Sequence, residues 1–419
     1  MDYLRELPDF IQRLLLRGNN SQDMVIGSGL CCYSFKLNNR ISQELYEGSL
    51  YISSDLRGEL IDVVFVKVAR REDAIKIFRN TAAANDGVVL KPWRYWFSGE
   101  KEFCNLPKDA ELRKGIWTLC YDHFEHNLKD WTNLVKGNVG YYDKLKLPIK
   151  IGNGCRLKEF WRDSIRKLIK GIGRIHSKGL YHGGLGLESN YVFIDKCLKV
   201  INIEGDLYEY EFEDGREWQK KADITDLLGM LDNWFESILA GGKRSWLECQ
   251  HFFDFVNRAK RKKLDYDKFV KKVVGHPFLL EADKRMRLLD HYETMRSGRN
   301  GQQVKFALAR PAFDNFKSWN STSTLNNMDK FMLGVYNHRN SSPSRKQKKS
   351  VVIKNIKSRI KPRVNYTVDV EDLLRYLRNL YHHYHQHGLA AGSMEDVDRG
   401  VTTHFRGFLE LLYMHLELY

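Results

Sequence analysis

The hydrophobic pattern of the chain changes character once, from strand-like to helical. Up to about residue 121 the apolar residues form short β-branched runs, and Ile61–Val68 (IDVVFVKV) is the clearest of them. One helical stretch is expected among these strands, at Arg71–Ala84, with Ile75, Ile77 and Phe78 on one side. From Leu157–His176 onward they recur at the three- and four-residue spacing of buried helices. A chain with its strands first and its helices afterwards is expected to fold as an α+β protein, with a small strand-rich part followed by a larger helical part.

Composition narrows the class of protein. The 419 residues are enough for two or three domains, each with its own core. With 68 Lys+Arg against 53 Asp+Glu, the formal net charge is +15, which favours RNA, DNA or an acidic lipid surface as partner without choosing among them. The sequence contains no run of about 18 apolar residues, so no membrane span is expected. The N-terminus does not have the pattern of a secretory signal. Seven scattered cysteines without a CxxC pair argue against a disulfide framework and a structural zinc site, and for a reducing compartment.

Three parts are expected along the chain. Residues 1–42 are predicted to be a helical segment with a linker, 43–275 a two-lobed domain whose first lobe ends near residue 119, and 276–419 a helical domain. Within the last part, residues 341–363 hold nine Lys/Arg and no acid from Arg345 to Arg363, which predicts an exposed basic loop. This loop is a solvated segment, an RNA-tracking arm or a nuclear localisation signal.

The first half resembles a protein kinase in the order of its landmarks. These are Lys67 in VFVKV for the β3 lysine, Leu119–Phe124 for the hinge, Arg174–His182 for the approach to the catalytic loop, and Asp223–Gly229 for the start of the large central helix. The resemblance implies a bilobal protein-kinase-like fold.

The residues that would transfer a phosphoryl group are missing. The reaction needs a base, Mg²⁺ ligands and a phosphate-binding loop. The matching positions read His182-Gly183-Gly184 for HRD, Ser189 beside Asn190 for the metal-binding asparagine, Asn202-Ile203-Glu204 for DFG, and Gly48 and Gly58 without GxGxxG spacing. We therefore predict a pseudokinase without kinase activity.

Lys67 and Asn202 leave two interpretations open. They could form a vestigial site for the phosphates of ATP or ADP, because a lysine binds phosphate as a point charge. Alternatively, Lys67 is a strand lysine satisfied by a neighbouring carboxylate. Glu72 is too close to Lys67 in sequence to be the usual helix partner, which favours the second interpretation.

The second half carries more specific motifs. They are His276–Leu280 (HPFLL) followed by a helical stretch at Ala282–Glu293, Asp372–Asn379 (DLLRYLRN) followed by His382-His383-Tyr384, and a closing helix at His404–His415. This combination resembles the kinase-extension nuclease (KEN) family, which includes the kinase/endoribonuclease of the unfolded protein response and ribonuclease L. The resemblance covers about residues 43–419 and is strongest in the last third.

The resemblance implies an all-α KEN domain that cleaves single-stranded or loop RNA without metal or cofactor and leaves 2′,3′-cyclic phosphate ends. It also implies a homodimer in a stress-response setting. The family motif falls on Arg378 and Asn379 as phosphate-binding residues, on His383 as general acid and on Tyr366 as general base. Asp372 matches the acid that opens the motif helix, where a first-turn carboxylate is stabilising in any case.

The residue types suit this chemistry. An imidazole transfers protons near neutral pH, a guanidinium grips phosphate oxygens, and an amide donates to the same charge. Asn379 and His383 are four residues apart and share a helix face. A free tyrosine titrates near pH 10, so Tyr366 would need the positive charge of Arg378. The segment Thr367–Glu371 is one residue shorter than is usual in the family.

Alternatives remain for both site and function. The patch His382, His383, His385 and His387 could bind a metal, although no Glu or Cys accompanies it. The chain could instead be a non-catalytic decoy or regulatory partner that forms a heterodimer with an active family member, or be switched by a regulatory protein through residues 1–40. A cytoplasmic location is expected, or a nuclear one directed by residues 345–363.

Overall fold

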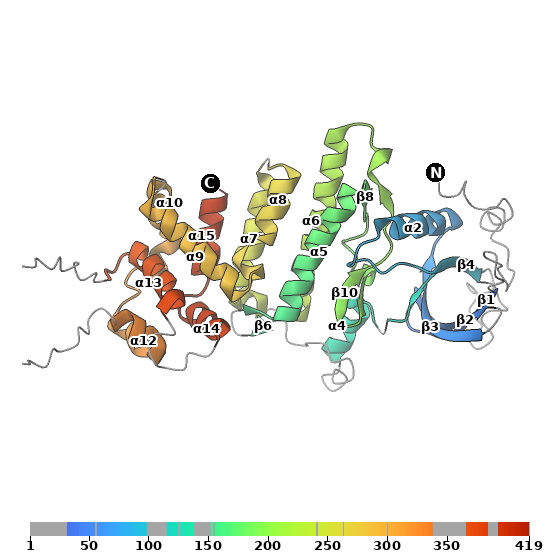
Figure 1. Ribbon diagram of the computed structural model, residues 1–419, viewed down its shortest axis with the longest axis horizontal. Helices are drawn as coiled ribbons and strands as arrows, with labels where there is room; N and C mark the ends of the chain where they lie inside the picture. Colours follow the sequence, from blue (N-terminus) through green and yellow to red (C-terminus); the bar gives the residue numbers. More distant parts are fainter. Residues whose placement is uncertain are drawn as a thin grey trace, which may run out of the picture. The chain divides into compact units, whose positions relative to one another are not determined.

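The computed structural model describes residues 32–54, 57–98, 115–124, 126–137, 152–153, 156–239, 242–262, 264–299, 301–337, 366–383 and 393–418. The structure is mixed α+β and rich in helix, with one five-stranded sheet (Figure 1). It divides into two compact units: unit 1 is Met1–Ile149 with Ser164–Ile238, and unit 2 is Lys150–Asp163 with Leu239–Tyr419. The basic loop predicted at 341–363 and most of the segment predicted at 1–42 lie outside the described residues.

Unit 1 begins with an antiparallel sheet in the order β1-β2-β3-β5-β4. A single helix, α2, lies between β3 and β4 in the chain and packs on this sheet (Figure 1). The elements are β1 (Cys32–Arg40), β2 (Leu45–Ser54), β3 (Arg57–Val68), α2 (Arg71–Ala84), β4 (Arg94–Ser98) and β5 (Ile116–Asp122). The strand predicted at Ile61–Val68 and the helix after it are therefore confirmed, and the strand is longer than expected.

The expectation of a helical segment and linker up to residue 42 is wrong in its last part. Residues Cys32–Arg40 form strand β1, which pairs with β2 from Cys32↔Ser53 to Arg40↔Tyr46. Leu37 is fully buried, whereas Asn39 and Arg40 are exposed. The strand lies at the edge of the sheet, and Tyr33, Phe35 and Leu37 alternate with polar residues, a strand pattern that the prediction of a linker overlooked.

The two faces of β3 bury different cores. Val64 and Val66 pack with Leu119 and with Ile77 of α2. Phe65 packs on the other face with a separate apolar cluster that includes Tyr46. Because side chains alternate along a strand, Lys67 belongs to the face of Phe65 and not to the face covered by α2.

The rest of unit 1 is mainly helical, with short hairpins between helices. In chain order these elements are α4 (Leu128–Gly137), α5 (Glu159–Ser177), β8 (Leu180–Tyr181), η4 (Glu188–Asn190), β9 (Tyr191–Ile194), β10 (Cys197–Val200), β11 (Gly205–Asp206), η5 (Leu207–Glu209) and α6 (Glu213–Ile238). A strand-rich part, a short link and a helical part with a loop–strand–loop–strand insertion follow one another as expected for a kinase-like arrangement.

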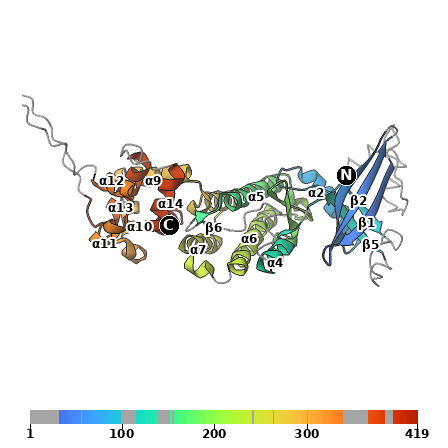
Figure 2. The same ribbon diagram turned by 90° about the horizontal axis from the view of Figure 1, so that it is seen from below.

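Every described element of unit 2 after His276 is helical; Figure 2 shows these helices from below. The unit contains β6 (Gly152–Asn153), β7 (Arg156–Leu157), η6 (Gly242–Ser245), α7 (Leu247–Arg261), α8 (Tyr266–Val274), η7 (Pro277–Leu279), α9 (Ala282–Ser297), α10 (Gly301–Leu308), η8 (Pro311–Phe316), α11 (Thr322–Asn327), α12 (Lys330–Asn337), α13 (Val370–His383), α14 (Met394–His404) and α15 (Phe408–Glu417). Thus α7 and α8 belong to unit 2 by their contacts, while the domain boundary expected at residue 276 stays a prediction. Within the described ranges, no helix is long and apolar enough to cross a membrane.

The closing helix starts later than predicted. The stretch His404–His415 was expected to be one helix, but α14 ends at His404 and α15 begins at Phe408. Gly407 between them has φ +73°, a left-handed conformation that interrupts a helix, and its N–H donates to Glu248 Oε1 at 3.1 Å. The apolar spacing continues through this break, which explains why the sequence concealed it.

A buried charge network connects the helices of unit 2. Arg285 of α9 is 1 % exposed and pairs with Asp398 of α14 at 2.9 Å and with Glu410 of α15 at 2.6 Å. Arg156 of β7 approaches the second oxygen of Asp398 at 3.0 Å, and Tyr381 of α13 donates its hydroxyl to Asp398 at 2.5 Å. The Asp398 carboxylate therefore joins three helices, α9, α13 and α14, to β7, and Arg285 extends the network to α15.

Candidate functional site

The predicted RNA-cleaving residues lie on α13 and just before it, and three of the four form a hydrogen-bonded chain. Asn379 Nδ2 donates to the Tyr366 hydroxyl at 3.0 Å, and Arg378 Nη1 donates to Asn379 Oδ1 at 3.1 Å. His383, the last residue of α13, is half-buried one turn beyond Asn379. The structure thus brings the tyrosine to the helix motif although Thr367–Glu371 is short.

Helix α13 holds these side chains because its opposite face is apolar. Leu373, Leu377 and Leu380 are buried, and the helix packs against α9 and α12. Beside the polar stripe lies a cavity of about 540 Å³. The residues that line this cavity belong to α9, to the residue that follows α9, and to α13. They are Asp290, Glu293, Thr294, Ser297, Gly298, Arg375, Arg378 and Asn379.

Tyr366 is fixed by aromatic packing and by the start of α13. Its ring stacks on Tyr336 at 5.6 Å and meets the edge of Trp319. The next residue, Thr367, donates its N–H to Asp372 at 2.5 Å, so Asp372 has the structural role predicted for it. This anchoring places the phenol at Asn379.

Arg375, and not Arg378, is the cation over the Tyr366 ring. Its guanidinium carbon lies 5.2 Å from the ring centroid, and Nη2 pairs with Asp372 at 2.8 Å. Sequence reasoning had assigned the activating charge to Arg378. The signal was present in the DLLRYLRN motif, since Arg375 is four residues before Asn379 and therefore on the same helix face.

Asp290 of α9 is the residue of this site that sequence reasoning missed. Its Oδ1 accepts from Arg378 Nε at 3.1 Å and from His382 Nε2 at 2.7 Å. It lies 88 residues before Arg378 in the chain, and no motif singles it out. Only the packing of α9 on α13 brings it into the site.

In unit 1, Asp223 of α6 holds the backbone of the loop that would carry a kinase base. This carboxylate, 1 % exposed, accepts from the N–H of His182 at 2.8 Å and of Gly183 at 3.1 Å, and it contacts His176 Nε2 at 2.9 Å. Burial lowers the pKa of His182, which is therefore neutral. Asp223 thus holds the main chain of the loop, but position 184, where the sequence motif places the catalytic aspartate of a kinase, is a glycine.

Two amides are bonded to each other where Mg²⁺ ligands would be expected: Asn202, at the first DFG position, and Asn190, beside Ser189. The Tyr121 hydroxyl donates to Asn202 Oδ1 at 2.8 Å, Asn202 Nδ2 donates to Asn190 Oδ1 at 3.0 Å, and Asn190 Nδ2 donates to the Gly184 carbonyl at 2.9 Å. Burial raises the pKa of the Tyr121 phenol, so it stays protonated and donates. Both asparagine oxygens thus accept hydrogen bonds within the protein.

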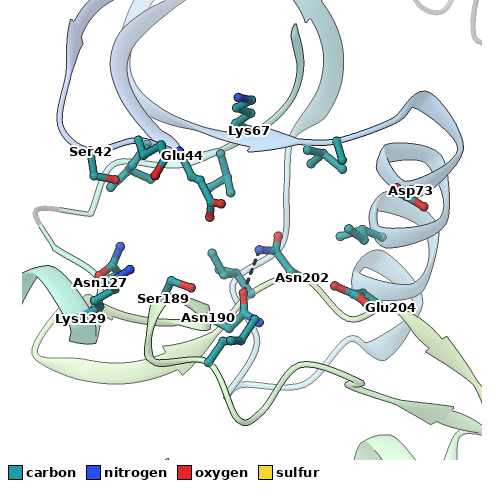
Figure 3. Close-up of a pocket in the computed structure, with 18 of the residues that line it drawn as sticks. Ser42, Glu44, Lys67, Asp73, Asn127, Lys129, Ser189, Asn190, Asn202 and Glu204 are labelled. Atoms are coloured by element: carbon teal, nitrogen blue, oxygen red, sulfur yellow. Dashed lines mark hydrogen bonds between the residues drawn. The ribbon is translucent and has the colours of Figure 1, made fainter. Parts of the chain in front are cut away.

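A second cavity, also of about 540 Å³, lies beside this chain in unit 1 (Figure 3). Figure 3 shows Glu44 pointing into it and Lys67 directed away from Asn202, as the strand alternation requires. Burial, with the charge of Asp73, raises the pKa of Glu204 at the same cavity. Lys67 and Asn202 both line this cavity without pointing toward each other, and a nucleotide site there stays a prediction.

The metal alternative gains no support from the described residues. They contain no group of three or more His, Cys, Asp or Glu side chains placed to hold an ion, and His385 and His387 lie outside them.

Comparison with known proteins places the chain in no family. No family model matches it, and no curated protein is similar to it. Solved structures overlap with it weakly. The PAN3 pseudokinase of Neurospora crassa is 10 % identical, with 78 % of this chain and 80 % of that chain covered and a TM-score of 0.36.

Two other structures overlap to the same extent. A Neurospora crassa complex of PAN2 with PAN3 gives 11 % identity, 73 % and 79 % coverage and a TM-score of 0.35. The Drosophila melanogaster PAN3 pseudokinase gives 12 %, 68 % and 79 %, and 0.34. Overlaps of this size carry no argument about this chain. The kinase-like features of unit 1 are the strand order of its sheet and the contacts of Asp223 with the loop at His182.

Proposed function

We propose that the chain is a metal-independent endoribonuclease whose site lies on α13, and that unit 1 is a non-catalytic, pseudokinase-like scaffold. The observation that carries the proposal is the chain Arg378–Asn379–Tyr366 beside a cavity. The four predicted residues come from α13 and from the segment before it. Hydrogen bonds join three of them in turn, from Arg378 to Asn379 and from Asn379 to Tyr366.

The geometry supports a specific division of roles. Tyr366 would accept the 2′-hydroxyl proton of RNA, because Asn379 and the Arg375 cation both stabilise a negative phenol oxygen. Arg378 and Asn379 would bind the phosphate, whose negative charge grows as the 2′-oxygen attacks phosphorus. His383 would protonate the departing 5′-oxygen. The products would be a 2′,3′-cyclic phosphate and a 5′-hydroxyl.

The test is cleavage of a labelled stem-loop RNA in EDTA by the full chain and by Arg378→Ala and His383→Ala. Removing one group that stabilises or protonates the transition state typically lowers the rate about 10²- to 10⁴-fold. Two matched controls should keep wild-type rates. Arg399→Ala removes an exposed arginine of α14, and His291→Ala removes an exposed histidine of α9.

The products identify the reaction. Cyclic phosphate ends with wild type and both controls, and their loss in both site variants, would support the proposal. Cleavage that persists in Arg378→Ala and His383→Ala would indicate a contaminating nuclease and contradict it.

A second candidate function is a non-catalytic partner of an active nuclease, favoured by the amide chain that replaces the kinase metal ligands in unit 1. This function predicts no cleavage by the purified chain at any concentration. It also predicts that adding the chain to an active KEN nuclease changes the rate of that enzyme. Light scattering of the chain alone, expected to show a homodimer under the first proposal, would then show a monomer.

A further inference from the structure

Asp290 makes the predicted phosphate site electrically balanced before RNA arrives. The cavity beside α13 is lined by two guanidinium groups, Arg375 and Arg378, and by two carboxylates, Asp290 and Glu293. Glu293 is engaged by Arg296 through both oxygens at 2.8 Å. Asp290 is instead paired with α13, the helix that carries the predicted site.

The pairing engages the groups that RNA would need. Arg378, proposed to bind phosphate, donates Nε to Asp290 Oδ1 at 3.1 Å, and His382 donates to the same oxygen at 2.7 Å. A carboxylate oxygen and a phosphate oxygen accept the same kind of hydrogen bond from a guanidinium. Asp290 and an RNA phosphate therefore compete for Arg378.

We propose that Asp290 is an affinity-determining residue of this site, which RNA phosphate displaces from Arg378 on binding. The inference depends on the proposed function. The side chains of Asp290 and Arg378 are 32 % and 37 % exposed, so the pair is partly solvated and can open without unfolding the helix packing.

Two substitutions test this directly. Asp290→Asn keeps the shape and removes the charge, and Asp290→Ala also removes the acceptor. The matched control is Asp283→Asn on the same helix, which has the same charge change and also loses an arginine partner, Arg287 at 2.8 Å, but lies outside the cavity. Circular dichroism establishes that each variant is folded.

The measurement is binding of a fluorescent, fully 2′-O-methylated single-stranded RNA, which cannot be cleaved, over a range of salt concentrations. An exposed ion pair contributes about 0.2–1 kcal/mol, so both Asp290 variants should bind about 1.4- to fivefold tighter than Asp283→Asn at low salt. The difference in affinity should shrink as the salt concentration rises, because salt screens the charge of Asp290 in the unmodified chain.

Equal or weaker binding by the Asp290 variants, relative to Asp283→Asn, would overturn the inference. That outcome is separate from the proposed function, because cleavage by the unmodified chain in EDTA is scored independently. If wild type cleaves RNA and Asp290→Asn binds no tighter, the nuclease stands and Asp290 does not compete with the substrate.

Discussion

At the scale of single residues, the motif around α13 allowed site residues to be predicted, whereas the sequence of the neighbouring helix α9 did not. Arg378, Asn379 and Tyr366 could be selected from the sequence because they match the motif of a family that the chain resembles, and in the structure Asn379 is hydrogen-bonded to the other two. Asp290 could not be selected, since its place depends on how α9 packs on α13. Lys67 was selected because a lysine inside a β-branched run resembles a kinase landmark. It lines the cavity of unit 1 but is directed away from Asn202 (Figure 3), and its role stays a prediction.

Arg375 should matter to cleavage although it belongs to no predicted role. Replacing it with Gln removes the cation 5.2 Å from the Tyr366 ring, and a cation–π contact contributes about 0.5–2 kcal/mol. We expect a roughly two- to thirtyfold lower cleavage rate. The acid limb of the pH–rate profile should also move to higher pH, because the phenolate loses a stabilising charge.

A matched comparison separates this role from general damage. Arg375→Lys keeps the charge and should retain most of the rate, and Arg399→Gln on the exposed side of α14 should behave as wild type. A uniform fall in rate with an unshifted pH profile would reduce Arg375 to a structural residue.

At the scale of elements, periodicity predicted where most helices lie but not where they break. Helix α2 was expected at Arg71–Ala84 and is found there. The break before α15 was not visible, because Gly407 interrupts a continuous apolar pattern and its N–H bonds to a residue of α7. A turn stabilised by a distant carboxylate leaves no local signal.

That carboxylate predicts a pH-dependent stability. Burial, and then the charge of Glu410, raises the pKa of Glu248 to about 7, above about 4.3 in the unfolded chain. The folded state therefore holds the Glu248 proton more tightly, and this group lowers stability as pH rises from about 4 to about 7, by up to about 3 kcal/mol. Glu248→Gln keeps an acceptor for Gly407, so it should raise the melting temperature clearly at pH 8 and little at pH 4.5.

The control is Glu236→Gln at an exposed position of α6. It should change the melting temperature equally little at both pH values. A Glu248→Gln gain that is independent of pH would contradict the assignment of the charge to the folded state.

At the scale of the molecule, the fold class could be predicted from the sequence, but the grouping of the helices into two units could not. The change from strand to helix pattern predicted the α+β class and the order of the parts. The grouping of α7 and α8 with unit 2 follows from long-range packing, which periodicity does not report. The buried network around Asp398 was equally invisible, because its members Arg156, Arg285 and Glu410 come from distant segments.

This network should hold unit 2 together. Arg285→Met leaves Glu410 and one oxygen of Asp398 without their buried cation, and removing one partner of such a pair costs about 3–5 kcal/mol. Calorimetry should show a large fall in the midpoint temperature of one unfolding transition. Arg287→Met, an exposed pair on the same helix, should change the free energy of unfolding by less than about 0.5 kcal/mol. Equal effects of the two variants would show that the network contributes no more than a surface pair.

The hydrogen bonds between Asp223 and the main chain at His182 and Gly183 bear on which substitutions this loop can accept. The carboxylate holds two main-chain N–H groups, which every amino acid except proline supplies. These two hydrogen bonds do not involve the side chain at position 184, although a Cβ there would lie 2.7 Å from Asn190 Nδ2, so the Asn190 amide would have to move. Substitutions in the loop can therefore change the chemistry offered at position 184 while Asp223 still holds the main chain at His182 and Gly183.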